Sequence, residues 1–256
     1  MPKKRKAAGA AGGAAKRKAA PKKSPAKKKK APAKKKATPK TPANVDHPLI
    51  DRGEVGSRYV DEEKGGVGID GVMQLCEDLE IQPEDKVMLA LSYHMLDKSE
   101  DPTMGEFSAS EWTEGLSKIF LGTKDYMLRV SDLKSKLPTL RAQMEPPAPE
   151  FKRIYLFAFM FMKESGQKGL DAQSAIDTWK LVEGSAPFTG ALFADWIKFV
   201  EAKSEKAKGF RITKDTWSLF WNFLEAMQDD LANYDPMGAW PVLIDDFVEM
   251  KEEEQA

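Results

Sequence analysis

The sequence predicts an all-α domain preceded by a disordered basic tail, and three observations lead to this prediction. From about residue 46 onward, apolar residues recur at helical spacing, and no stretch shows sustained alternation with a period of two. The first 44 of the 256 residues carry 17 Lys and Arg but no Asp or Glu. All 24 aromatic residues lie at or after Tyr59, so a hydrophobic core can form only beyond the tail.

The tail, residues 1–44, consists almost entirely of Lys, Ala, Pro and Gly. Such a segment cannot bury enough apolar surface to offset the entropy lost on ordering, so we expect it to be disordered. Compact basic clusters at residues 3–6, 16–18 and 27–30 are typical of nuclear import signals or of arms that bind phosphate. A solvated polycation that only keeps the protein soluble is the simpler interpretation. We expect a nuclear location, and contact of the tail with nucleic acid is compatible with its charge.

Beyond the tail the chain carries 40 − 17 = 23 basic and 40 acidic residues, a balance of −17 against +17 in the tail. The two segments are therefore interpreted separately. About 210 residues can bury a substantial core, either as one domain or as two closely packed halves. We predict one helical domain over residues 45–250 and a short acidic C-terminal tail over residues 251–256.

Apolar stripes with the i, i+3, i+4, i+7 spacing mark the expected helices. They lie at residues 75–95, 151–162, 193–199 and 217–231. The segment 145–149, which reads Glu-Pro-Pro-Ala-Pro, is expected to connect two halves. Thr213 is expected to cap the helix that contains Trp217, with Asp215 in the first turn, where the helix dipole favours an anion. Pro241 suits the first position of the last helix.

A faint internal repeat suggests two EF-hand-like helix-loop-helix halves. Residues 68–70 and 169–171 each lead from a glycine through an apolar residue and an Asp into a helix. A Phe followed by Ser or Thr, at residues 107–108 and 188–189, then opens a further helix in each half. On EF-hand spacing the ligand positions include lysines and end on a methionine or a serine, which cannot bind calcium as a bidentate carboxylate does. We expect no metal, and ordinary helix-loop-helix turns explain the pattern equally well.

The composition excludes several classes of protein. The single cysteine, Cys76, excludes an intrachain disulfide framework and a Cys-rich zinc site, and two histidines leave little for metal or triad chemistry. Cys76 and His94 lie among apolar residues, which favours a buried thiol and a core or boundary histidine. No apolar run approaches the roughly 20 residues that span a bilayer, and no secretory signal is present. We expect a soluble intracellular protein with no catalytic residue, cofactor or membrane contact.

The C-terminal stretch carries the most distinctive motif, GAWPVLIDDFVE at residues 238–249. Together with residues 214–217 and 228–235, it resembles the potentiating-neddylation domain of the defective-in-cullin-neddylation family. Further segments agree with this resemblance at residues 68–71, 166–171 and 175–179. The resemblance extends over roughly residues 60–250. Some members of the family begin with a ubiquitin-binding helical module. Here a basic tail stands in its place, and in this respect the chain is similar to the nuclear members.

The resemblance implies a non-catalytic, all-α scaffold that promotes transfer of a ubiquitin-like modifier to cullins. The partners it implies are the cullin C-terminal winged-helix region, the N-acetylated neddylation-conjugating enzyme and the RING-box ligase subunit of the same complex. The cullin-binding residues it implies are Asp215, Ala239, Asp245, Asp246 and Glu249. Two carboxylates beside a small residue would let a partner's Lys or Arg approach closely. From the residues alone, Asp215 is simply a helix-start acid and Asp245 a solvated surface charge.

The resemblance also implies an apolar pocket for the acetylated N-terminal helix of the conjugating enzyme. Its lining falls on Ile69, Val72, Met88, Leu91, Ser92, Met95, Phe107, Phe161 and Leu181. Plain core packing explains about half of these equally well. The sequence departs from the family pattern in the segment 98–105, which is longer, at Met104-Gly105, where a polar residue and a cysteine are frequent, and at Thr178, where a tyrosine is frequent.

Two other classes of function remain open at this point. A nuclear chromatin-associated protein could bind DNA through the tail and a basic partner, such as a histone, through the acidic body. An enzyme with an unrecognised site is the third alternative, which the scarcity of His and Cys disfavours. Deleting residues 1–44 separates the first two, because a scaffold for cullin modification does not depend on the tail for its activity in solution.

Overall fold

The computed structural model describes residues 53–96, 98–121, 128–227 and 230–255, and the predicted tail at 1–44 lies outside them. The chain divides into two units, residues 1–43 and 44–256, and every described residue belongs to the second. The described part is mainly helical, as predicted. Its helices are α1 (Glu54–Ser57), α2 (Ile69–Leu79), α3 (Val87–Leu96), α4 (Ala109–Ile119), α5 (Val130–Ala142), α6 (Pro149–Met162), α7 (Ala172–Leu181), α8 (Gly190–Lys206), α9 (Lys214–Met227) and α10 (Val242–Gln255).

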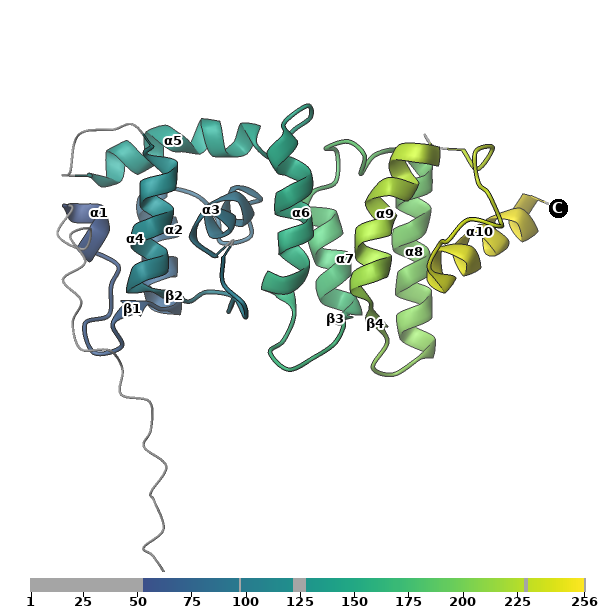
Figure 1. The fold of residues 1–256 in the computed structure, drawn as a ribbon, viewed down its shortest axis with the longest axis horizontal. Coiled ribbons are helices and arrows are strands. Elements are labelled where there is room, and N and C mark those ends of the chain that lie inside the picture. Colours follow the sequence, from purple (N-terminus) through teal and green to yellow (C-terminus); the bar gives the residue numbers. More distant parts are fainter. Residues whose placement is uncertain (1–52, 97, 122–127, 228–229, 256) are drawn as a thin grey trace, which may run out of the picture. The chain divides into compact units, whose positions relative to one another are not determined.

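In the part of the chain that the structure describes, four two-residue strands join the helices into two similar halves (Figure 1). In the first half, β1 (Gly66–Val67) pairs antiparallel with β2 (Phe107–Ser108). In the second half, β3 (Leu170–Asp171) pairs antiparallel with β4 (Arg211–Ile212). Each strand lies in the loop immediately before a helix, so each half is a pair of EF-hand-like helix-loop-helix units joined through their loops.

Both Phe-Ser/Thr pairs of the predicted internal repeat open a helix, but strand pairing shows that they are not equivalent positions of the two halves. Phe107-Ser108 forms β2 before α4, but its counterpart in the second half is β4 before α9, not Phe188-Thr189. Phe188-Thr189 does precede a helix, α8, in which Thr189 is the N-cap residue. The two pairs look alike in sequence because an extended residue followed by Ser or Thr begins many helices, whereas strand pairing identifies the equivalent loops.

Capping residues mark the starts of several helices, whereas Pro241, expected at the first position of the last helix, lies one residue before α10 begins. Ser108 and Glu111 form a capping box at the start of α4, and the carboxylate of Asp171 accepts hydrogen bonds from the first turn of α7. Pro149, at the end of the proline-rich connector, is the first residue of α6. Among the residues that the structure describes, no group of three or more His, Cys, Asp or Glu could hold a metal ion. None of the described helices is long and apolar enough to cross a membrane.

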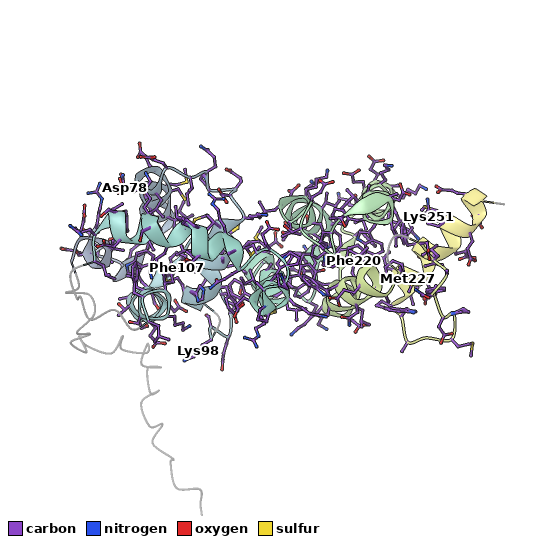
Figure 2. All side chains as sticks on the ribbon, turned by 90° about the horizontal axis from the view of Figure 1, so that it is seen from above. Asp78, Lys98, Phe107, Phe220, Met227 and Lys251 are labelled. Carbon is purple, nitrogen blue, oxygen red and sulfur yellow. The ribbon has the colours of Figure 1, made fainter. Side chains whose placement is uncertain are left out.

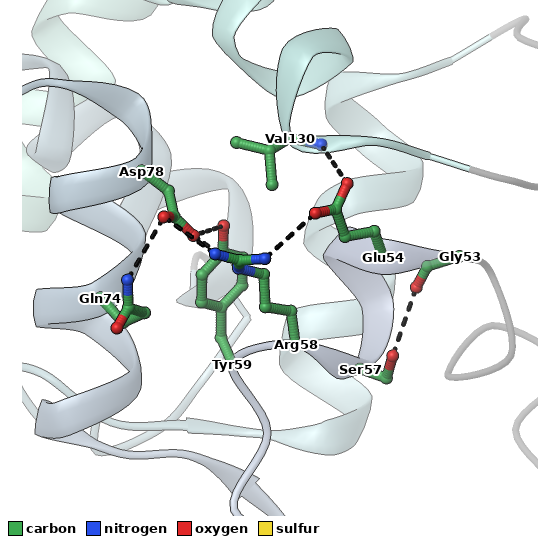
Figure 3. A network of polar contacts seen from close by, with 8 residues as sticks. All are labelled: Gly53, Glu54, Ser57, Arg58, Tyr59, Gln74, Asp78 and Val130. Atoms are coloured by element: carbon green, nitrogen blue, oxygen red, sulfur yellow. Dashed lines mark hydrogen bonds and ion pairs between the residues drawn. The ribbon is translucent and has the colours of Figure 1, made fainter.

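A polar network fixes α1 against α2 and α5 (Figure 3). Arg58 binds Asp78 of α2 through its Nε at 2.6 Å and Glu54 through its Nη1 at 3.2 Å. The Tyr59 hydroxyl donates to the same Asp78 at 2.9 Å, and Glu54 accepts from the backbone N–H of Val130, the first residue of α5. Burial, followed by the bond to Asp78, raises the pKa of Tyr59, so its hydroxyl remains a donor at neutral pH.

The core of the second half is a stack of aromatic rings. Tyr155 of α6 stacks on Trp217 of α9 at 4.6 Å, and Trp217 stacks on Trp179 of α7 at 5.1 Å. The Trp217 indole donates to the Tyr155 carbonyl at 2.9 Å, and the Tyr155 hydroxyl donates to the Trp217 carbonyl at 2.8 Å. The Trp217 indole and the Tyr155 hydroxyl therefore each have a partner inside the stack, and these two bonds hold α9 at a defined rotation relative to α6.

Cys76 and His94 are structural, as the sequence indicated. Cys76 is a free, buried cysteine, and burial raises the pKa of its thiol. The Nε2 of His94 lies 2.8 Å from the side-chain oxygen of Gln143, which satisfies the ring at the boundary of the core. Neither residue is therefore placed for nucleophilic or metal chemistry.

Candidate functional site

Two features of the described chain are candidates for binding. The first is the C-terminal surface, which we define by Asp215, Ala239, Asp245, Asp246 and Glu249. The second is an apolar cavity between the two halves. The first is built from α9, α10 and the loop that joins them, and the second from α2, α3, α6, α7 and β2.

The start of α9 exposes Asp215. The Thr213 hydroxyl accepts from the backbone N–H of Thr216 at 3.0 Å, so the predicted cap is present. Asp215 lies in the first turn and is exposed, while Trp217, two residues later, is fully buried in the aromatic stack. Because Trp217 cannot turn outward without emptying the core, Asp215 is held on the outside of the helix.

The last helix, α10, presents an acidic face because its opposite face is buried. Ile244, Phe247 and Val248 are fully or almost fully buried. The Phe247 ring lies at 5.3 Å from Trp196 and 5.4 Å from Phe199, both in α8. With this stripe inward, the helical period turns residues 242, 245 and 249 away from the core. These are a valine, an aspartate and a glutamate, the last two of which belong to the C-terminal surface.

Two contacts anchor the segment around Ala239, which precedes α10, to the helices on either side. The Tyr234 hydroxyl donates to the Asp245 carboxylate at 2.6 Å, and the Trp240 ring packs edge-on against Phe223 of α9 at 5.7 Å. Ala239, between these anchors, is exposed. Partial burial and the bond to Asp245 raise the pKa of Tyr234 to about 12, so Tyr234 stays a hydrogen-bond donor to this carboxylate.

Two ion pairs hold α10 against α8 and change the expected charge pattern. Lys203 binds Asp246 at 2.7 Å, and Lys251 binds Asp195 at 2.8 Å (Figure 2 labels Lys251). Asp246 therefore has its own counter-ion and adds less to the negative field than the sequence suggested. In the described part of the chain, no ion pair involves Asp215, Asp245 or Glu249, so these three provide the unpaired charge.

The boundary predicted at residue 250 falls inside α10, which continues to Gln255. Residues 251–255 are therefore part of the last helix rather than a separate acidic tail, and Lys251 is one of the residues that hold this helix to α8. The sequence did not predict this extension of α10, because a run of glutamates has good helix propensity but carries no apolar stripe that would mark a packed helix.

The structure places all five residues of the C-terminal surface on one pair of packed helices and their connection. Asp215 lies in the first turn of α9, Ala239 lies in the loop between α9 and α10, and the other three residues lie on α10, which contacts α9. All five are exposed or half-exposed. Their joint role in binding stays a prediction.

The second candidate is a cavity of about 450 Å³ whose walls come from both halves. Seven of the nine residues predicted for the pocket line it. They are Ile69 and Val72 of α2, Met88 and Ser92 of α3, Phe107 of β2, Phe161 of α6 and Leu181 of α7. Residues more than 100 positions apart in the chain, such as Ile69 and Leu181, thus meet in one apolar space, which the sequence alone could not show.

Leu91 and Met95 do not line the cavity. Leu91 is fully buried in the core, and Met95 lies two turns beyond Met88 along α3, against Gly115 of α4. A Cβ at Gly115 would lie 2.0 Å from the Met95 sulfur, so Met95 fills the contact between these helices. For these two residues, core packing is the correct interpretation.

Several lining residues were not predicted as part of the pocket. They are Met73, Pro83, Glu84, Asp85, Leu89, Met104, Gly105, Met162, Asp177 and Thr178. Met73 follows Ile69 by one helical turn, and this spacing on one face of α2 was the signal that could have identified it. Met104, Gly105 and Thr178 are the positions at which the sequence departs from the family pattern, so these departures lie in the cavity wall itself.

The mouth of the cavity is apolar and open. Ile69, Met73 and Met104 are 61%, 51% and 58% exposed, which is unusual for large apolar side chains. Gly105 has a φ of +80°, and a Cβ there would lie 3.1 Å from the Ile69 side chain. Glycine therefore lets the 103–106 loop approach α2 and form one edge of the mouth.

The deeper wall offers few polar groups. Ser92 and Thr178 are buried, and the Thr178 hydroxyl donates to the Ser174 carbonyl within its own helix at 2.7 Å. The carboxylates of Glu84 and Asp177, by contrast, belong to exposed residues. The cavity is therefore suited to an uncharged apolar group in its interior and to basic groups near its edge.

Asp85, which also lines the cavity, is held by Arg141 of α5 through two bonds of 2.7 and 2.6 Å. Beside it, Lys86 binds Glu145 of the connector and the Ser185 hydroxyl, which donates to Glu145 at 2.9 Å. These contacts tie the start of α3 to the connector and to the second half. They hold the two sides of the cavity together.

Replacing Arg141 with glutamine should lower the free energy of unfolding by about 1 kcal/mol, because Arg141 is partly exposed and the pair is only partly desolvated. Burial favours protonation of Asp85, but the bonds from Arg141 and the Val87 N–H outweigh it and place its pKa below the ordinary value. The stability from Arg141 is therefore present above about pH 4 and disappears as the pH falls through the lowered pKa. Chemical denaturation at several pH values measures this.

Arg153→Gln is the matched control, because Arg153 is exposed on α6 and has no ion pair in the described chain. It should change stability by less than about 0.5 kcal/mol at every pH. An Arg141 effect that persists undiminished at pH 2 would contradict the assigned ion pair.

Comparison with known proteins gives consistent results. A family model described as "Cullin binding" matches residues 132–250, a segment that includes the whole C-terminal surface. The chain is 31% identical over 225 residues to "Defective in cullin neddylation protein 1" of Caenorhabditis elegans, covering 79% of this chain and 72% of that protein. It is 33% identical over 190 residues to "DCN1-like protein 5" of Bos taurus, covering 74% and 73%. It is 41% identical over 180 residues to "DCN1-like protein 3" of Drosophila melanogaster, covering 70% of this chain and 49% of that protein.

Proposed function

The chain belongs to the DCN1-like family and has a role in cullin neddylation, and from this premise we propose that it is a non-catalytic scaffold that brings a cullin and a neddylation-conjugating enzyme together. One observation carries the proposal. A single folded unit offers both an exposed surface with unpaired carboxylates and an apolar cavity with an open apolar mouth. Two such features provide separate binding sites for two partners of different chemistry.

The cullin binds the C-terminal surface. Asp215, Asp245 and Glu249 supply negative charge and form no ion pair with any residue that the structure describes, and Ala239 leaves room for a partner's Lys or Arg to approach. The Tyr234 bond orients the Asp245 carboxylate before the partner arrives, which lowers the entropy cost of binding. The cullin surface that fits is basic, and the resemblance assigns it to the C-terminal winged-helix region.

The conjugating enzyme binds the inter-half cavity through its N-acetylated helix. An acetylated methionine is uncharged and apolar, so the cavity can desolvate it at little cost, whereas a free ammonium group would lose its hydration there. The exposed side chains at the mouth extend the apolar contact to the next turn of the incoming helix. Glu84 and Asp177 favour basic residues beyond the anchor.

Acceleration then requires no chemistry by this chain. Binding both partners converts the encounter of the charged conjugating enzyme with the cullin lysine into an intramolecular event at high effective concentration. The RING-box subunit, bound to the same cullin, would hold the conjugating enzyme from its other side. The basic clusters of residues 1–44 would direct the protein to the nucleus.

A reconstituted reaction tests this function. We expect the full chain to accelerate cullin modification in the presence of the modifier, its activating and conjugating enzymes and the RING-box subunit. A chain that lacks residues 1–44 should accelerate the reaction to within about two-fold of the full chain, since the residues assigned to the two binding sites all lie after residue 68. Loss of acceleration together with loss of DNA binding would instead favour the alternative of a chromatin-associated protein acting through its tail.

A further inference from the structure

Two large apolar side chains near the acidic residues of the C-terminal surface, Met237 and Val242, are exposed to solvent. Met237 is 90% exposed and Val242 is 75% exposed, and Ala239 between them is also exposed. We call these three residues the apolar ridge. Removing exposed apolar groups of this size from water stabilises a complex with a partner. A ridge of such groups next to carboxylates therefore indicates a contact surface.

The loop conformation keeps the ridge facing outward. The backbone N–H of Met237 donates to the Asp235 side chain at 2.9 Å, and the N–H of Gly238 donates to the Asp235 carbonyl at 2.9 Å. A Cβ at Gly238 would lie 2.9 Å from the Trp240 indole nitrogen, so the turn is packed directly on that ring. Since Trp240 takes the inward position against Phe223, Met237 and Ala239 are left on the outside.

The ridge continues into the acidic face of α10. Val242 is the first residue of α10, and Asp245 and Glu249 follow it at i+3 and i+7 on the same outer face. The Tyr234 bond to Asp245 fastens the ridge-bearing loop to this first turn. An apolar group and unpaired carboxylates therefore adjoin one another along a single surface.

We propose that the apolar ridge receives an apolar side chain of the same basic protein that the carboxylates attract, an inference that rests on the proposed function of the C-terminal surface. The occupant follows from charge complementarity and from continuity with that surface. A partner that brings lysines or arginines to Asp245 and Glu249 lies directly over Val242, on the same face of α10, and is placed to reach the rest of the ridge. The carboxylates steer the encounter and set the register, while the ridge is dehydrated on contact and lengthens the lifetime of the complex.

The other large apolar residues that are more than half exposed lie at other places in the chain. Ile69, Met73 and Met104 surround the mouth of the inter-half cavity. Leu121, 88% exposed, lies after α4 in the first half, away from both candidate sites in the sequence. Leu121 therefore provides a control of the same chemical kind outside the ridge.

The test measures binding of the full chain to an isolated cullin C-terminal winged-helix domain by titration calorimetry at several salt concentrations. The double substitution Met237→Ser with Val242→Ser should weaken binding about ten-fold and make the heat-capacity change of binding less negative. It should leave the slope of log Kd against log salt unchanged. Asp245→Asn keeps an acceptor for Tyr234 but removes the charge, and it should flatten the slope. Leu121→Ser should change neither quantity.

The outcomes separate the two proposals. If the ridge variant binds as tightly as the unaltered chain while Asp245→Asn weakens binding, the inference about the ridge is wrong and the function of the acidic surface stands. If the unaltered chain does not bind the cullin domain, both are overturned. Circular dichroism melting checks folding, and a ridge variant that melts like the unaltered chain but binds more weakly supports the proposal.

Discussion

Reversing both carboxylates, Asp215→Lys together with Asp245→Lys, should weaken the affinity for the cullin winged-helix domain by about 100-fold, or about 2.7 kcal/mol. The change removes two attractions and replaces them with repulsion toward a basic partner. Neither acid has a cation partner within the described chain, so the variant loses no intramolecular ion pair. Calorimetry at about 0.15 M salt measures the loss, which should shrink as added salt screens the charges.

The control for this variant is Glu62→Lys with Glu63→Lys. These two residues are exposed in the first half, and their reversal changes the net charge by the same amount. We expect a change of less than about two-fold, from the long-range field only. Unchanged cullin affinity after reversal of Asp215 and Asp245 would remove the C-terminal surface from the proposed function.

The second large effect concerns the mouth of the cavity. Ile69→Asp should weaken binding of a peptide with the acetylated N-terminal sequence of the conjugating enzyme by about 30-fold, because a carboxylate replaces apolar contact where the helix enters. Ile69 is mostly exposed and is the first residue of α2, where the helix dipole favours an acid, so the fold should not suffer. Fluorescence polarisation with a labelled peptide measures the affinity.

Acetylation itself provides the companion measurement. The unaltered chain should bind the acetylated peptide at least about ten-fold more tightly than the same peptide with a free amino group. Leu121→Asp, with a carboxylate at an exposed apolar position elsewhere, should not alter either affinity. Equal binding of the two peptides would show that the cavity does not receive the acetylated end.

Local features of the fold were readable from the sequence because they depend on neighbouring residues. The Thr213 cap, the proline connector at residues 145–149 and the Trp217 stripe each follow from interactions within a turn or two of helix. The sequence correctly indicated that Phe107-Ser108 and Phe188-Thr189 each open a helix, but it could not show that the loop equivalent to Phe107-Ser108 is β4, which pairs with β3. The same local logic failed beyond residue 250, where α10 continues.

In the candidate sites, too, the features that depend on neighbouring residues were predictable and those that depend on distant residues were not. The positions of Asp215 and Asp245 at helix starts could be expected from the sequence, but the neutralisation of Asp246 by Lys203 could not, since these residues lie on different helices. Most of the predicted pocket does line one cavity. Leu91 and Met95 differ because apolar residues of a helix buried on nearly every side give no indication of which side faces a space.

The order of charged, proline-rich and apolar residues was sufficient to identify a helical domain, its caps and the side chains able to bind, because hydrophobic periodicity and capping act over a few residues. Tertiary packing alone decided which of those side chains share a cavity, which carboxylates keep an unpaired charge, and that Met237 and Val242 stay exposed beside them. These properties depend on contacts between segments distant in the chain, and their energies exist only once the two halves and α10 have packed.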